Sequence, residues 1–175
     1  MVIVYEIIKL LTFPGALLKG FLEHLFCRIY KVPVEYSDYM QRNELCGHVE
    51  HLLAPKKGSF GICFGPHLIM LLLGLVIAFP GAVQLFYLGT FSWLSVILLY
   101  VGVSFLTNCF PLVEDALNMW EHLFSAESKT VSKVLLAVPA AVMYAGSYLE
   151  RYGISLLTSL AFAYVLPWIV AFFVG

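Results

Sequence analysis

Charged residues are scarce in this chain. Asp, Glu, Lys and Arg make up only 12% of the 175 residues, while 61% are hydrophobic and the mean hydropathy is +0.90. An average soluble domain has about 25% charged residues. The shortage of charge argues against an ordinary soluble domain and indicates a membrane protein. The formal net charge of −1 gives no basic excess of the kind that indicates a nucleic-acid partner.

Closely spaced cysteine pairs are missing as well. Cys27, Cys46, Cys63 and Cys109 contain no CxxC pair, which argues against a zinc ribbon and a disulfide framework. The N-terminus lacks both the basic stretch and the small-x-small cleavage site of a signal peptide, so we expect it to be retained.

Long hydrophobic segments dominate what is present. Several of them approach the ~20 apolar residues that a helix needs to cross a bilayer. The sequence predicts an α-helical polytopic membrane protein with one domain, 1–175, and about five transmembrane helices. The expected spans are 2–29, 60–79, 91–108, 131–149 and 153–173. We expect a loop region with a small β element at 30–59 and an interfacial helix at 112–125.

The basic residues predict an orientation. The loops at 30–59 and 111–130, with their flanks, carry most of the Lys and Arg, whereas the opposite loops carry only Arg151. By the positive-inside rule the basic side is cytoplasmic. This places the N-terminus outside and the C-terminus in the cytoplasm.

The first predicted span carries ionisable residues that a lipid-facing helix would not tolerate. Lys19, Glu23 and His24 lie in an otherwise apolar stretch that begins with Phe13-Pro14-Gly15. Ionisable groups at membrane depth are costly and usually face the interior of a helix bundle. Lys19 and Glu23 are four residues apart, so they lie on one face of a helix.

Four segments together resemble the site-2 protease family of intramembrane zinc metalloproteases. Its members share a Phe-Pro-Gly-x-x-x-His-Glu-x-x-His helix, of which this chain keeps the Phe-Pro-Gly frame. The other three segments are Gly47-His48-Val49-Glu50-His51, Phe64-Gly65-Pro66-His67 and Asn108-Cys109-Phe110-Pro111-Leu112-Val113-Glu114-Asp115-Ala116. The small bacterial and archaeal members imply a location in the plasma membrane of a prokaryote.

The resemblance implies where the protease chemistry would lie. It puts the zinc ligands at Lys19, Glu23 and Asp115 and the catalytic glutamate at Gly20. An ammonium group does not bind zinc, and glycine has no side chain to move a proton. The resemblance therefore implies a pseudoprotease with no catalytic residue and no metal cofactor. We expect the Lys19 ammonium to replace the metal cation between Glu23 and Asp115.

Two alternatives stay open. An active zinc metalloprotease with unusual ligands would use Glu23, His24 and Asp115, joined by His48, His51 or His67. A small transporter-like or channel-like subunit would use the intramembrane charges as a pathway.

The favoured interpretation is binding without cleavage. An exposed strand edge can receive an extended segment of another protein. We therefore predict a scaffold, chaperone or regulatory subunit for a membrane protein partner, as an oligomer or within a hetero-complex. The strands expected at 32–36 and 45–51 would bind this partner. The residues assigned to that role are Val32, Val34, Tyr36, Gly47, His48, Val49 and His51.

Overall fold

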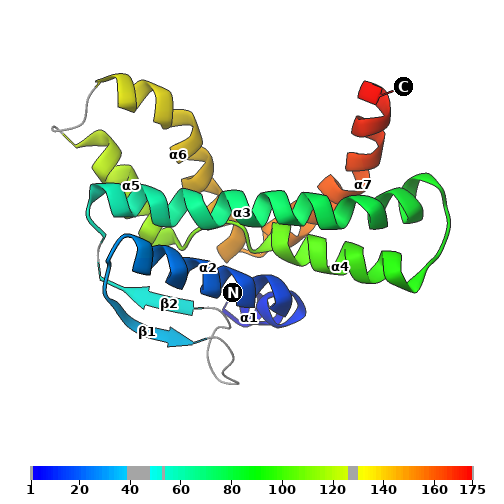
Figure 1. The fold of residues 1–175 in the computed structure, drawn as a ribbon, viewed down its shortest axis with the longest axis horizontal. Coiled ribbons are helices and arrows are strands. Elements are labelled where there is room, and N and C mark those ends of the chain that lie inside the picture. The colour runs from blue at the N-terminus through cyan, green and yellow to red at the C-terminus, as the bar shows by residue number, and fades with distance from the viewer. Residues whose placement is uncertain (1, 39–47, 53, 126–129, 175) are drawn as a thin grey trace.

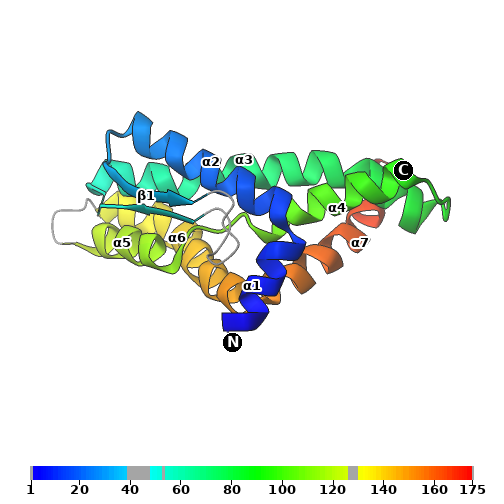
Figure 2. The same ribbon diagram turned by 90° about the horizontal axis from the view of Figure 1, so that it is seen from below.

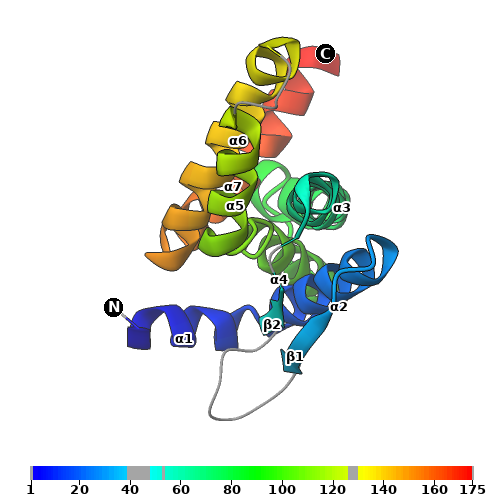
Figure 3. The same ribbon diagram turned by 90° about the vertical axis from the view of Figure 1, so that its left-hand side faces the viewer.

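The computed structural model describes residues 2–38, 48–52, 54–125 and 130–174, and it is predominantly helical (Figure 1). The elements are α1 (Val2–Leu11), α2 (Phe13–Ile29), β1 (Val34–Asp38), β2 (His48–His51), α3 (Lys56–Ala82), the π-helix η1 (Val83–Tyr87), α4 (Trp93–Thr107), α5 (Val113–Phe124), α6 (Thr130–Arg151) and α7 (Ile154–Val174). The α3–α4 hairpin lies at the centre. Helix α2 and the two strands lie on one side of it, and α5, α6 and α7 lie on the other (Figure 3).

The first predicted span is broken by a sharp bend. Helices α1 and α2 meet at 94° around Thr12, two residues before Pro14, which stands in the first turn of α2. A bend of this kind leaves backbone groups without helical partners. Ser104 of α4 accepts a hydrogen bond from the Gly15 amide and donates one to the Thr12 carbonyl, both at 2.8 Å. Ser104 of α4 therefore provides hydrogen-bond partners for the backbone groups at the bend.

Glycine lets α2 and α4 approach this closely. A Cβ atom at Gly15 would lie 2.1 Å from the carbonyl oxygen of Ser104. Gly102 plays the same part between α3 and α4, where a Cβ atom would lie 2.4 Å from the backbone nitrogen of Ala78. A side chain at either position would overlap with the backbone of the neighbouring helix, so both positions require glycine.

Helix α3 is longer than the predicted span at 60–79. It begins at Lys56, passes through Pro66 and Pro80 without ending, and continues into η1. Proline is tolerated inside a helix where the freed carbonyl finds another partner. A π-turn adds one residue to the local hydrogen-bonded ring, a feature that hydropathy does not reveal.

Two helical segments, Gly58–Tyr87 and Ile154–Phe173, are long and apolar enough to cross a membrane. The bent α1–α2 pair makes a third if it is counted as one span. Helix α4 is apolar but has only 15 residues, fewer than a span requires. The described residues thus contain two to three candidate membrane-spanning units.

The predicted β element is an antiparallel pair of strands. Ser37 pairs with Val49, and the register shifts between Val34 and Tyr36. Strand β1 begins at Val34, later than the expected residue 32, and Val32 precedes it as a buried core residue. Strand β1 is the outer strand of the pair, farther from the helices than β2 (Figures 1 and 3).

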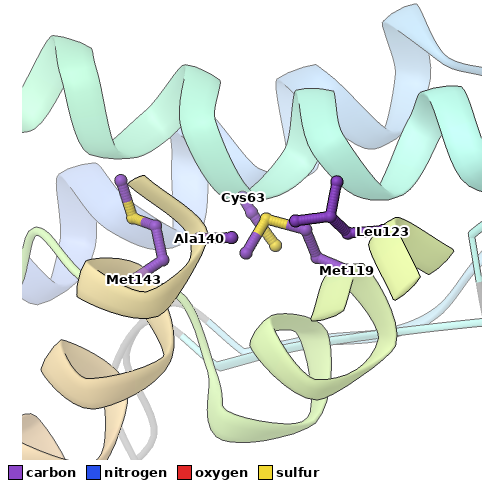
Figure 4. Close-up of a cluster of buried hydrophobic side chains, with 5 residues drawn as sticks. All are labelled: Cys63, Met119, Leu123, Ala140 and Met143. Carbon is purple, nitrogen blue, oxygen red and sulfur yellow. The ribbon is translucent and has the colours of Figure 1, made fainter. Parts of the chain in front are cut away.

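Helix α5 is packed into the molecule on its apolar side. Met119 and Leu123 form a buried cluster with Cys63 of α3 and with Ala140 and Met143 of α6 (Figure 4). Glu114, Leu117 and Glu121 remain exposed. The helix therefore joins α3 to α6 and keeps one open face.

Candidate functional site

The face of α2 that carries Lys19, Gly20 and Glu23 is buried. Lys19 and Glu23 are each only 4% exposed, and Gly20 is buried between them. The spacing of four residues puts both charged groups on one face, as predicted. The sequence therefore locates the buried face of this helix correctly.

The Lys19 ammonium binds a carboxylate that the sequence analysis did not single out. Its Nζ lies 2.9 Å from Oε1 of Glu150, at the end of α6. Lys9 of α1 binds the same oxygen at 2.6 Å. The second oxygen of Glu150 accepts a hydrogen bond from the Phe110 amide at 3.2 Å. Three helices and the segment after α4 thus meet at one buried carboxylate (Figure 2 shows α1 and the end of α6 close together).

Asn108 connects this ion cluster to the bend between α1 and α2. Its Oδ1 accepts a hydrogen bond from Lys9 Nζ at 2.7 Å. Its Nδ2 donates to the Thr12 hydroxyl and to the Ser104 carbonyl, each at 2.8 Å. Buried polar groups are tolerated when their hydrogen bonds are made. We refer to Lys9, Lys19, Asn108 and Glu150 as the ion cluster.

Asp115 binds a different cation from the one we expected. Its Oδ1 lies 3.2 Å from Nε2 of His51, and His51 Nδ1 donates to the Leu52 carbonyl at 2.9 Å. The hydrogen bond to Asp115 raises the pKa of His51 to about 9. The neighbouring carboxylate thus favours the charged form of the imidazole.

Other polar residues of α5 also hold the segment that joins β2 to α3. Asn118 Nδ2 donates to the Ala54 carbonyl at 3.4 Å, and His122 Nε2 donates to the same oxygen at 3.2 Å. With Asp115 they form a row at positions i, i+3 and i+7, one face of the helix. This face binds the 51–54 segment.

Lys19 pairs with Glu150 and Asp115 pairs with His51, so the expected bridge from Lys19 to Asp115 is wrong. Glu23 lies within electrostatic reach of both Lys19 and Asp115. The unusual zinc site at Glu23, His24 and Asp115 is not supported. In the described parts of the chain, no three His, Cys, Asp or Glu side chains are placed to hold a metal ion.

The remaining predicted residues are distributed as follows. Val34, Tyr36, His48, Val49 and His51 lie in the two strands, Val49 is fully buried, and Gly47 falls outside the described residues. His67 is buried and donates a hydrogen bond from Nδ1 to the Cys109 carbonyl at 3.1 Å. Its position is that of an interior histidine with a backbone partner.

Sequence reasoning missed Lys9 and Glu150 as site residues. A signal was present, because two lysines in an apolar helical segment require a buried acid. Glu150 lies one residue beyond the predicted span at 131–149. Its partners Lys9 and Lys19 lie 141 and 131 positions away, so no local pattern links them.

Comparisons with models of protein families, with curated proteins and with solved structures gave no match. The resemblance to site-2 proteases therefore rests on the four motifs alone, and the function is argued from the geometry.

Proposed function

We propose that this chain is a non-catalytic, site-2 protease-like membrane protein that binds a membrane protein partner as a scaffold, chaperone or regulatory subunit. The observation that carries the proposal is the pairing of Lys19 with Glu150. At the position where the resemblance puts a zinc ligand, a buried ammonium is neutralised by a carboxylate and cannot bind a metal. Gly20 offers no group for proton transfer.

The proposed arrangement in the membrane keeps the basic loops in the cytoplasm of a prokaryote. Trp168 of α7 lies 5.2 Å from Tyr87, so the C-terminal end of α7 is proposed to lie on the opposite face with the turn between η1 and α4, and not in the cytoplasm. Helix α4 is short and the α1–α2 pair is bent, but α3 packs against α2 and α4 and shields them from lipid on one side. Buried backbone and polar groups inside a membrane protein must be satisfied internally. The hydrogen bonds of Ser104 and Asn108 meet this requirement at the bend.

The β hairpin is the proposed docking element. Strand β2 is held to α5 through His51 and Asp115, which leaves the outer edge of β1 as the available edge. An extended segment of a partner would add to this edge through backbone hydrogen bonds. The buried residues Val32 and Val49 anchor the hairpin on the helices and would keep the edge fixed during docking.

Site-specific photocrosslinking in native membranes tests this function. A photoreactive amino acid at Glu35, an exposed position of β1, should give a crosslinked product of one defined mass. The matched control is Val76, a 70%-exposed position on α3 that the proposal assigns to lipid. A product from position 76 but none from position 35 would contradict docking at β1. Mass spectrometry of the product would identify the partner.

A further inference from the structure

The α3–α4 hairpin lies almost entirely in a long stretch of the sequence that has no Asp, Glu, Lys or Arg. From Gly58 through Val113 there is no Asp, Glu, Lys or Arg, whereas Lys56 and Lys57 precede this stretch and Glu114 and Asp115 follow it. The two charged ends lie together, because the Cys63 thiol in α3 donates a hydrogen bond to the Asp115 carbonyl at 3.3 Å. We call this end the base of the hairpin. The turn between η1 and α4 forms the opposite end (Figures 1 and 2).

Aromatic rings collect at the end opposite to the base. Tyr87, Phe91 and Trp93 are 47%, 68% and 75% exposed. Helix α7 adds two rings here, since Tyr87 lies 5.2 Å from Trp168 and Phe86 lies 5.3 Å from Tyr164, measured between ring centroids. We call Tyr87, Phe91, Trp93, Tyr164 and Trp168 the aromatic tip.

The length of the hairpin matches a membrane. The helical segment Gly58–Tyr87 has 30 residues, and at about 1.5 Å per residue it spans about 45 Å. A hydrocarbon core is about 30 Å thick, so a helix whose base lies at one surface reaches the other. Trp and Tyr are enriched at membrane interfaces, because their rings are apolar while their N–H and O–H groups bind water or headgroups.

We propose that the aromatic tip lies at the lipid–water interface on the membrane face opposite to the base. The bilayer interface is the partner of this surface. Large exposed rings without a nearby charge fit that boundary, whereas a surface in bulk water would usually carry charged residues.

This placement also fixes the depth of the ion cluster. Helix α4 runs from the tip for 15 residues, or about 22 Å, before it ends beside Asn108. Asn108 would thus lie inside the hydrocarbon core, on the half nearer the base. At that depth an unsatisfied polar group is costly, which agrees with the complete set of hydrogen bonds that Asn108 makes.

Fluorescence quenching by brominated lipids tests the depth. The protein has three tryptophans, and the variant Trp120→Phe/Trp168→Phe leaves Trp93 as the only emitter. In phosphatidylcholine vesicles we expect bromine near the glycerol end of the acyl chains to quench Trp93 more than bromine near the bilayer centre does. Stronger quenching from the centre, or no quenching by either lipid, would overturn the proposal.

The matched control is Trp93→Phe/Trp168→Phe, which leaves Trp120. Trp120 packs against Phe124 and Tyr144, with centroid distances of 4.6 and 5.8 Å. We expect lipid quenching of Trp120 to be weaker than that of Trp93. Equal quenching profiles for Trp93 and Trp120 would contradict a defined depth of the aromatic tip at the lipid–water interface.

The sidedness is tested separately with a membrane-impermeant maleimide on sealed vesicles of known orientation. In a background without native cysteines, Thr90→Cys next to the tip and Glu114→Cys at the base are both exposed positions. The two thiols should react from opposite faces, and reaction from the same face would overturn the proposal. Neither test involves the β hairpin, so failure of partner binding and failure of this placement are distinguishable.

Discussion

Glu150 accepts hydrogen bonds from two lysines through a single oxygen and from a backbone amide through the other. Removing one partner of a buried ion pair leaves an uncompensated charge, whereas removing all partners leaves an apolar site. The consequence of a substitution in the ion cluster thus depends on which charge it leaves behind.

We predict that Glu150→Leu destabilises the protein by about 3–5 kcal/mol, because it removes the carboxylate that the buried Lys9 and Lys19 ammoniums bind directly. Lys19→Met should cost less, since Lys9 still neutralises Glu150. Denaturant titration in detergent measures both changes. The matched control is Glu121→Leu on the exposed face of α5, which should have little effect. Equal stability of Glu150→Leu and Glu121→Leu would contradict a structural ion cluster.

The combination Lys9→Met/Lys19→Met/Glu150→Leu, which removes all three charges of the ion cluster, should be more stable than Glu150→Leu alone. Replacement of a whole buried ion cluster by apolar residues avoids the cost of desolvating each charge. The same titration compares the triple variant with the single one. If the triple variant is the less stable of the two, the charges act independently and the cluster is not a unit.

At the scale of elements, contacts between helices depend on glycine. Gly102→Ala should destabilise the α3–α4 hairpin by about 1–3 kcal/mol, because the added methyl group meets the backbone of Ala78. Gly58→Ala is the matched control, since its Cβ would have only ordinary contacts at 3.5 Å and alanine favours a helix. Thermal unfolding should show a loss for the first variant and none for the second. Similar melting temperatures would indicate that α3 and α4 can move apart.

The contact between α5 and β2 should depend on pH. The pKa of His51 is raised to about 9 by Asp115, from an ordinary value of 6.5. The stabilisation is therefore fully present below about pH 6.5 and is lost as the pH rises through 9. A hydrogen bond to a charged group contributes about 1.5–3 kcal/mol. The wild-type protein should accordingly lose more stability between pH 6 and pH 10 than Asp115→Asn does.

Unfolding curves at several pH values measure this difference. Asn118→Ala serves as a control, because it removes a neighbouring contact of α5 with the 51–54 segment and leaves the ion pair intact. Its pH dependence should follow that of the wild type. An unchanged pH dependence in Asp115→Asn would show that His51 does not hold β2 to α5.

At the scale of the whole molecule, hydropathy and local motifs predicted the positions of the helices better than the contacts between them. The segments at 112–125 and 153–173 lie close to the helices α5 and α7. These features depend on neighbouring residues. The pairing of Lys19 with Glu150 depends instead on how α2 and α6 pack, which no spacing in the sequence encodes.

The pairing of the two buried lysines with Glu150 is also a property of the whole molecule. The ion cluster joins α1, α2 and α6, so the charge that would hold these helices together is supplied by the chain itself. We therefore predict that protein purified in mild detergent without chelator contains less than stoichiometric zinc, and that EDTA leaves its melting temperature unchanged.

Elemental analysis and thermal unfolding with and without EDTA make this measurement. Asp115→Ala and Glu114→Ala form a matched pair, since Glu114 is the exposed neighbour of Asp115. Stoichiometric zinc that is lost in Asp115→Ala but kept in Glu114→Ala would contradict the non-catalytic function and support a metalloprotease with unusual ligands. A metal-free protein that still melts cooperatively would leave the Lys9 and Lys19 ammoniums as the cations that neutralise the buried carboxylate of Glu150 and hold the three helices together.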